Sequence, residues 1–112
     1  MNCQIISLDS FRKDAKQLAK KYAKLAVDLQ KLSDILSVNP KAGIALSDGL
    51  HKLRLQNSST NSGKSGGFRV IYYYLDERNN VYLMKMYSKT EIANIDENKL
   101  LQILESSGIK QV

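Results

Sequence analysis

Apolar residues recur with helical spacing through a long segment near the start of the chain. They follow one another at steps of four and three residues, and no glycine or proline interrupts residues 10–38. The members of this stripe are Phe11, Ala15, Leu18, Tyr22, Leu25, Leu29, Leu32 and Leu36. The period predicts a helix with one apolar face, and Asp9 or Ser10 is available as its N-cap. A single helix would be about 40 Å long, more than a small domain's diameter, so we expect it to project from the core or to break into a hairpin near residues 22–26.

Alternating apolar and polar residues in the second half of the chain predict strands. Leu53 and Leu55 alternate with polar neighbours, which is the period of a half-buried strand. The whole pattern predicts strands at residues 4–8, 50–56, 68–75 and 81–87 and an amphipathic helix at 96–107 that stops at Gly108. Helices placed ahead of a run of strands are typical of an α+β fold, here a single domain over residues 1–112.

Two segments without regular periodicity separate these elements. Asn39-Pro40, followed by Gly43, ends the helical segment, because proline disfavours helix at the residue before it. Residues 57–67 consist only of Asn, Ser, Thr, Gly and Lys. This composition indicates a mobile loop between two strands.

The chain is basic, with 17 Lys and Arg against 11 Asp and Glu and a net charge of +6. Such a charge attracts polyanions, nucleic acid first, although a soluble lysine-rich protein has the same balance. Cys3 and His51 are the only cysteine and histidine, which excludes an internal disulfide and a zinc module of four Cys or His ligands. The lone cysteine, the lack of an apolar run of about 20 residues and the lack of a signal-peptide pattern favour a cytoplasmic location, away from the membrane.

Familiar enzyme signatures are missing from the sequence. Gly63-Lys64-Ser65 resembles the end of a Walker phosphate loop, but Ser58 stands where the first glycine is required. His51 has no cysteine nucleophile beside it, and we expect Cys3 to be a small core residue. No pair of carboxylates has a spacing that suits a metal-dependent nuclease. We therefore expect no metal and no cofactor.

Basic residues on three successive predicted strands form the main candidate site. Residues two apart on a strand share a face, and neighbouring antiparallel strands bring such faces together. Arginine gives bidentate phosphate contacts, and tyrosine offers a surface to an unpaired base. The pattern therefore favours a phosphate-backbone site over a merely solvated face. Its members are Lys52, Arg54, Arg69, Tyr73, Lys85, Tyr87 and, just past the last strand, Lys89.

A basic site without a metal can cleave RNA. The 2′-OH attacks the adjacent phosphate, a base takes its proton, and cations stabilise the added charge. A lysine can be that base where neighbouring cations lower its pKa. We expect Arg69 to be partly solvated, beside a core Phe68 and facing Lys52 and Arg54. The alternative is a structural bridge from Arg69 to an acidic group in residues 76–77.

Several motifs stand at characteristic spacings from the middle of the chain onward. They are Asn39-Pro40-Lys41-Ala42-Gly43, Leu46, Gly49-Leu50, Lys52-Leu53-Arg54, the run from Gly63 to Tyr73, and Met86-Tyr87-Ser88-Lys89-Thr90-Glu91. With the Lys-rich segment from Leu18 to Tyr22, they resemble the RelE/ParE toxin superfamily, in its HigB-like branch, over nearly the whole chain. The resemblance implies an N-terminal helical hairpin packed on a twisted antiparallel sheet of about four strands, with a C-terminal helix.

The resemblance also implies a function and partners. It implies the toxin of a bacterial toxin–antitoxin pair, which cuts mRNA in the ribosomal A site and is silenced by a cognate antitoxin of helix-turn-helix type. DNA contact is then expected only through the antitoxin complex. A tyrosine of the RelE terminal helix corresponds to about Ile95 here, and Tyr87 is its candidate substitute. Two alternatives stay open, a toxin of the same fold that acts on DNA gyrase and a degenerate binding module.

The resemblance assigns site residues by position. The family's catalytic positions fall on Lys52, Arg54, Arg69 and Lys89. The candidates for RNA binding are Lys64, Tyr73, Lys85 and Tyr87.

Overall fold

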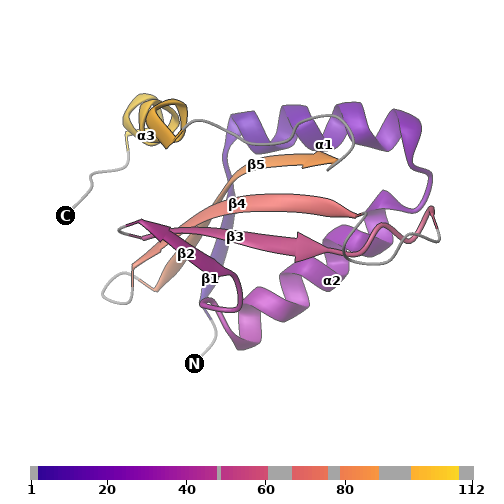
Figure 1. Ribbon diagram of the computed structural model, residues 1–112, viewed down its shortest axis with the longest axis horizontal. Helices are drawn as coiled ribbons and strands as arrows, with labels where there is room; N and C mark the ends of the chain where they lie inside the picture. Colours follow the sequence, from indigo (N-terminus) through magenta and orange to yellow (C-terminus); the bar gives the residue numbers. More distant parts are fainter. Residues whose placement is uncertain (1–2, 48, 61–66, 76–78, 89–96, 109–112) are drawn as a thin grey trace.

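A five-stranded sheet with strand order β1-β5-β4-β3-β2 forms the centre of the molecule (Figure 1). The computed structural model describes residues 3–47, 49–60, 67–75, 79–88 and 97–108. The strands are β1 (Gln4–Ser7), β2 (Ile44–Ser47), β3 (Leu50–Leu55), β4 (Phe68–Leu75) and β5 (Asn80–Ser88), and the helices are α1 (Asp9–Lys21), α2 (Leu25–Val38) and α3 (Glu97–Ser106). The predicted α+β class is confirmed.

The sheet differs from the expected one in two respects. β2 is an additional strand that pairs with β3, so the sheet has five strands rather than about four. β1 pairs with β5 in parallel, with Gln4 opposite Asn80, so the sheet is mixed rather than antiparallel. The β2 strand is only four residues long and largely exposed, and therefore shows little apolar alternation. The predicted antiparallel pairing of β1 was wrong, because residue periodicity carries no information about which strand a given strand pairs with.

The long helical segment breaks into two helices, at the position predicted for a hairpin. Tyr22 takes an extended conformation, with φ −120° and ψ 104°, and its N–H closes α1 by donating to the Leu18 carbonyl. The Tyr22 ring packs edge-on against Phe68, with ring centroids 5.3 Å apart. This core contact holds the chain out of the helical conformation between α1 and α2.

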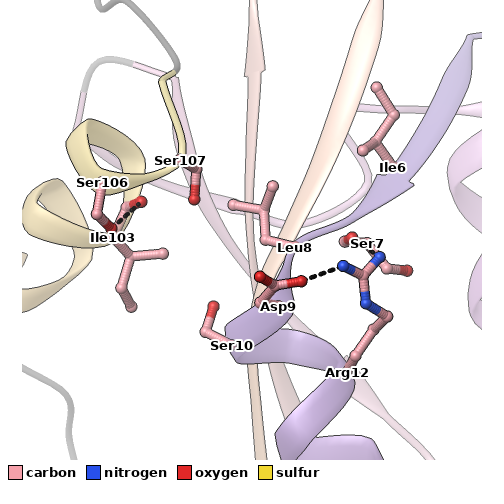
Figure 2. Close-up of a pocket in the computed structure, with 9 residues that line it drawn as sticks. All are labelled: Ile6, Ser7, Leu8, Asp9, Ser10, Arg12, Ile103, Ser106 and Ser107. Carbon is pink, nitrogen blue, oxygen red and sulfur yellow. Dashed lines mark hydrogen bonds and ion pairs between the residues drawn. The ribbon is translucent and has the colours of Figure 1, made fainter.

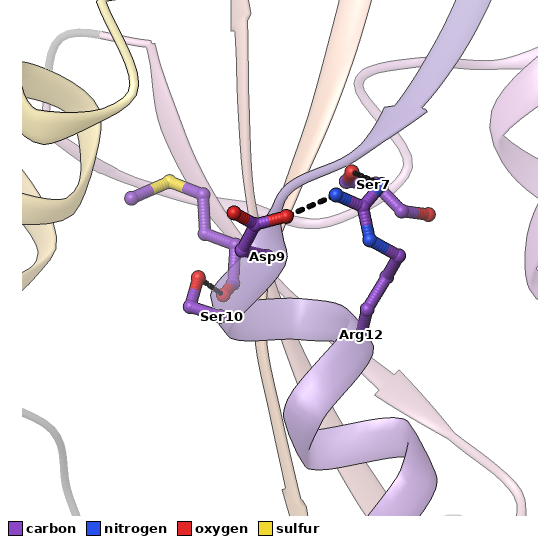
Figure 3. A network of polar contacts seen from close by, with 5 residues as sticks. Ser7, Asp9, Ser10 and Arg12 are labelled. Carbon is purple, nitrogen blue, oxygen red and sulfur yellow. Dashed lines mark hydrogen bonds and ion pairs between the residues drawn. The ribbon is translucent and has the colours of Figure 1, made fainter.

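The start of α1 is not capped as the sequence suggested. Leu8 occupies the N-cap position, and no side chain caps the helix, so the predicted caps Asp9 and Ser10 are wrong. Both belong to the first turn instead: Asp9 pairs with Arg12, and the Ser10 hydroxyl donates to the Met84 carbonyl of β5 (Figure 3). Tertiary contacts to the sheet thus replace a local cap.

The two faces of the sheet carry separate apolar cores. The first face packs under α1 and α2, and every residue of the predicted apolar stripe is buried in this core or packs against it. The second face packs under α3, over the end of the sheet where β3 begins and β4 ends (Figure 1). The core of the second face includes Leu50, Ile71, Tyr73, Met84, Leu100 and Leu104. The opposite end of the second face is where the predicted basic residues lie.

The chain that follows β3 is anchored over its described part, which corrects the expectation of a mobile loop from residue 57 onward. Asn57 is buried, and its side-chain oxygen accepts the N–H of Ser59. The fully buried carboxylate of Asp28 accepts both the N–H and the hydroxyl of Ser58, and the Lys24 N–H donates to the Ser59 hydroxyl at 2.9 Å. These bonds join the end of β3 to the start of α2.

Candidate nucleic-acid site

A row of side chains crosses three strands on the second face. Arg54 of β3 lies opposite Arg69 of β4, and Arg69 lies opposite Tyr87 of β5. Directly opposed residues of antiparallel strands point to the same face, so the three form one row, which we call the site row. Lys52 shares this face two residues before Arg54. The register therefore agrees with the expected placement of Arg69 beside the basic pair of β3.

Arg69 is more deeply buried than expected. Only 5 % of its surface is exposed, so the expectation of a partly solvated side chain is wrong. It sits on β4, a strand paired on both sides, and its guanidinium donates to the Phe68 carbonyl at 3.3 Å. A charge at this depth interacts strongly with its neighbours, because the surrounding medium screens it less than water does.

Tyr87 is also buried, with 3 % of its surface exposed. Burial raises the pKa of its phenol above the ordinary value, and the charge of Arg69 lowers that pKa only in part. The phenol therefore stays protonated at neutral pH and is able to donate a hydrogen bond. Tyr73 lies in the core under α3, so neither ring presents an open surface for base stacking in this conformation.

Lys85 is held by α1. Its ammonium lies 2.9 Å from the carboxylate of Asp14, which also accepts the Met86 N–H at 3.0 Å. β1 ends at Ser7, so the polar side chains of α1 take over the edge of β5 beyond that point. The charge of Lys85 is thus balanced within the protein. No local pattern predicts this ion pair, because Asp14 lies 71 residues before Lys85 in the chain.

The backbone of Lys52 is closely approached by Gly43, the residue before β2. The Tyr72 hydroxyl accepts the Gly43 N–H at 3.0 Å, and a Cβ at Gly43 would lie only 2.7 Å from the Lys52 carbonyl oxygen. The Tyr72 ring stacks on His51, with centroids 5.0 Å apart and an interplanar angle of 8°. A hollow of about 200 Å³ borders Lys52 and Arg54 at this edge of β3. Sequence reasoning missed these supports, although an Asn-Pro turn followed by glycine was a visible signal.

A larger hollow of about 430 Å³ lies elsewhere, between the start of α1 and the end of α3 (Figure 2). Its charged groups, Asp9 and Arg12, pair with each other, and Arg12 also donates to the Ser7 carbonyl at 2.8 Å. Three further serines and apolar side chains complete its wall. None of the predicted site residues lines this hollow.

Each of the remaining predicted residues either belongs to the core or lies outside the described residues. Cys3 is a buried core residue, as expected, and its thiol donates to the Leu36 carbonyl at 3.1 Å. Lys64 and Lys89 lie outside the described residues, as do Ile95 and the acidic residues at 76–77. Within the described part of the chain, no three His, Cys, Asp or Glu side chains come together as metal ligands, and no helix is long and apolar enough to cross a membrane.

Solved structures share this architecture over most of the chain. The toxin–antitoxin complex RelBE2 from Mycobacterium tuberculosis aligns with a TM-score of 0.59 at 18 % identity, covering 81 % of this chain and 95 % of that chain. The isolated RelE toxin of E. coli aligns with a TM-score of 0.58 at 16 % identity, covering 93 % and 98 %. The chain has a RelE-like fold.

A third match is an E. coli RelE mutant in complex with a peptide of the antitoxin RelBc, with a TM-score of 0.54 at 16 % identity and coverage of 100 % and 99 %. No family model matches the chain. The RelE-like fold is thus kept with few identical residues. In it, the site row lies on β3, β4 and β5, which are consecutive both in the chain and in the sheet.

Proposed function

We propose that this chain is the toxin of a bacterial toxin–antitoxin pair and that it cleaves mRNA on the ribosome. The RelE-like fold supports the toxin assignment, because RelE toxins are among the structures that share it. The site row, with Lys52 beside it, supports the nuclease assignment and is the observation that carries it. The cognate antitoxin is proposed to be of helix-turn-helix type, and contact with DNA to occur only through the antitoxin complex in the cytoplasm.

In the proposed reaction the 2′-oxygen forms a bond to the adjacent phosphorus while the bond to the 5′-oxygen breaks. The products are a 2′,3′-cyclic phosphate and a 5′-hydroxyl. Arg69 donates to the phosphate and follows its charge as the transition state forms, since a fixed guanidinium needs little reorganisation. The one proton of the 2′-OH passes to the neutral amine of either Lys52 or Lys89, and the protonated Tyr87 phenol donates a proton to the departing 5′-oxygen.

Arg54 is the solvent-side member of the site row. It is exposed, unlike Arg69 and Tyr87, and it borders the hollow next to Lys52. This position suits a contact to a phosphate that flanks the scissile one. Lys64 and Lys85 remain proposed RNA contacts, although Lys85 would first have to leave Asp14.

The decisive experiment is induction of the protein in bacteria, followed by primer extension on a translated mRNA and on a copy of that mRNA without a start codon. We expect growth arrest and cleavage of the translated copy alone. The variant Arg69→Gln should abolish both, and Lys99→Gln, an exposed substitution on α3, should leave both unchanged. Growth arrest without cleavage would contradict the nuclease. Normal growth with abundant soluble protein would contradict the toxin assignment.

A further inference from the structure

The outer side of α1 carries a second concentration of positive charge. Lys13, Lys16 and Lys20 are exposed on this helix, and Lys24 follows in the turn that leads to α2. At 100° per residue the three lysines of α1 lie opposite Phe11 and Leu18, the buried residues of this helix. We call the four lysines the basic stripe. Lys13 to Lys20 span about 10 Å along the axis of α1, and Lys24 lies beyond the break at Tyr22 that ends this helix.

The acidic residues of α1 do not neutralise the basic stripe. Asp9 pairs with Arg12, and Asp14 pairs with Lys85 of β5. In the described part of the chain, no ion pair involves a lysine of the basic stripe. The charge of these four side chains is therefore directed at solvent.

The outer side of α2 shows that such a stripe is not a general requirement for solubility. This helix carries a single basic residue, Lys31, and its exposed residues include Val27, Ile35 and Val38. The two helices cover the same face of the same sheet. If lysines served only to keep this face soluble, α2 with its exposed apolar groups would need them more than α1. The lysines are instead gathered on α1.

We propose that the basic stripe binds the sugar–phosphate backbone of a folded RNA. Phosphates of one nucleic-acid strand follow one another at a few ångströms along the helix axis, so the lysines of α1 are able to reach more than one phosphate of the same strand. Flexible ammonium groups in a line suit a backbone whose phosphates lie at variable positions, and they need no base contact.

The direction of α1 relates the basic stripe to the site row. Ser10 contacts Met84 and Asp14 contacts Met86, so α1 advances along β5 in the direction of that strand. The stripe thus leads toward the end of the sheet that carries Arg69 and Tyr87, on the other face. The proposal deepens the proposed function. It rests on that function in one respect, because a toxin that cuts translated mRNA works beside ribosomal RNA, which is then the folded RNA that the basic stripe binds.

The test measures binding by fluorescence anisotropy to a hairpin of 2′-O-methyl RNA with a stem of about 16 base pairs. This probe cannot undergo 2′-OH attack, so the result does not depend on nuclease activity. The stripe variant and the control variant each lose three exposed positive charges. The stripe variant combines Lys13→Gln, Lys16→Gln and Lys20→Gln. The control variant combines Lys31→Gln, Lys41→Gln and Lys99→Gln.

We expect the stripe variant to bind the hairpin about tenfold more weakly at moderate salt, and the slope of log Kd against log salt concentration to fall by about 2 to 3. The control variant should change much less. Equal losses of hairpin affinity in both variants would overturn the proposal, because binding would then depend on net charge and not on where the lysines lie. Unchanged hairpin binding together with weaker binding of polyglutamate would also overturn it, in favour of an acidic protein partner.

Discussion

The site row and the basic stripe are both cationic, but they hold their charges in opposite ways. The Arg69 guanidinium is buried on a central strand beside a buried phenol, whereas the lysines of the basic stripe stand exposed on one helix. A buried, fixed charge acts strongly on one atom, and exposed charges act weakly, add together and are screened by salt. The difference separates a place suited to chemistry from a place suited to docking.

The largest expected effect comes from Arg69, whose removal should break the site row and spare the basic stripe. Arg69→Ala should lower the single-turnover cleavage rate on programmed ribosomes about 10²–10³-fold, the scale for one oxyanion donor. Arg69→Lys should recover only part, because an ammonium cannot make the paired contact.

The burial of Arg69 means that stability must be measured alongside activity. Truncation should cost about 1–3 kcal/mol of unfolding free energy, because it leaves buried polar neighbours unsatisfied. Hairpin binding through the basic stripe should stay at the wild-type level. Wild-type cleavage by a variant with a lowered melting temperature would refute the catalytic role.

The next effect concerns the support of Lys52. Gly43→Ala places a methyl group 2.7 Å from the Lys52 carbonyl oxygen, and backbone cannot move away as a flexible side chain would. We expect a loss of about 1–3 kcal/mol in urea denaturation, together with slower cleavage and unchanged hairpin binding. Ser47→Ala, an exposed change at the end of β2, the strand that follows Gly43, is the control and should stay within about 0.5 kcal/mol.

A smaller effect is expected at Asp14, the α1 residue that pairs with Lys85 of β5. Asp14→Asn removes the ion pair, whose partners are about a quarter exposed, and should cost about 1 kcal/mol or less. Asp34→Asn on α2 makes the same change in net charge at an exposed position. If freed Lys85 contributes to RNA binding, hairpin affinity should rise more in the first variant than in the second. Equal affinities would remove Lys85 from the binding set.

The smallest effect at neutral pH comes from the buried phenols. Burial raises the pKa of Tyr87 and of Tyr72, so the folded protein holds protons that the unfolded chain releases above about pH 10. Stability should therefore be constant near neutrality and fall as pH rises from about 10 through the folded pKa values. Urea denaturation at a series of pH values checks this, and Tyr87→Phe should reduce the slope. A slope of the opposite sign would show that Arg69 outweighs burial.

The sequence predicted those features that depend on local periodicity. The stripe from Phe11 to Leu36 located both helices and the core under them, and the alternation around Leu53 located β3. The break at residues 22–24 was one of two open possibilities, because the competing contact of Tyr22 with Phe68 is distant in sequence. Two of the wrong predictions, the N-cap of α1 and the direction of β1, also depend on contacts between residues far apart in the sequence.

The candidate site was predictable as a set of residues but not as an environment. Strand period placed Lys52 and Arg54 on one face, and the register brought Arg69 and Tyr87 beside them. The burial of Arg69 and Tyr87 depends on contacts between distant elements, such as the packing of Tyr87 in the core of the second face, and a local pattern does not show them. The capture of Lys85 by Asp14 similarly needs the path of α1 along β5.

The parallel pairing of β1 with β5 sets the order in which the molecule can assemble during synthesis. β1 has no strand to pair with until β5 has been synthesised, because Gln4 lies opposite Asn80. The first strand made is therefore among the last to join the sheet. Such distant contacts slow folding, because the intervening chain must be ordered before they form. Arg69 likewise lacks its neighbour Tyr87 until β5 has been synthesised. A growing chain on the ribosome therefore cannot complete the site row until most of its own message has been translated.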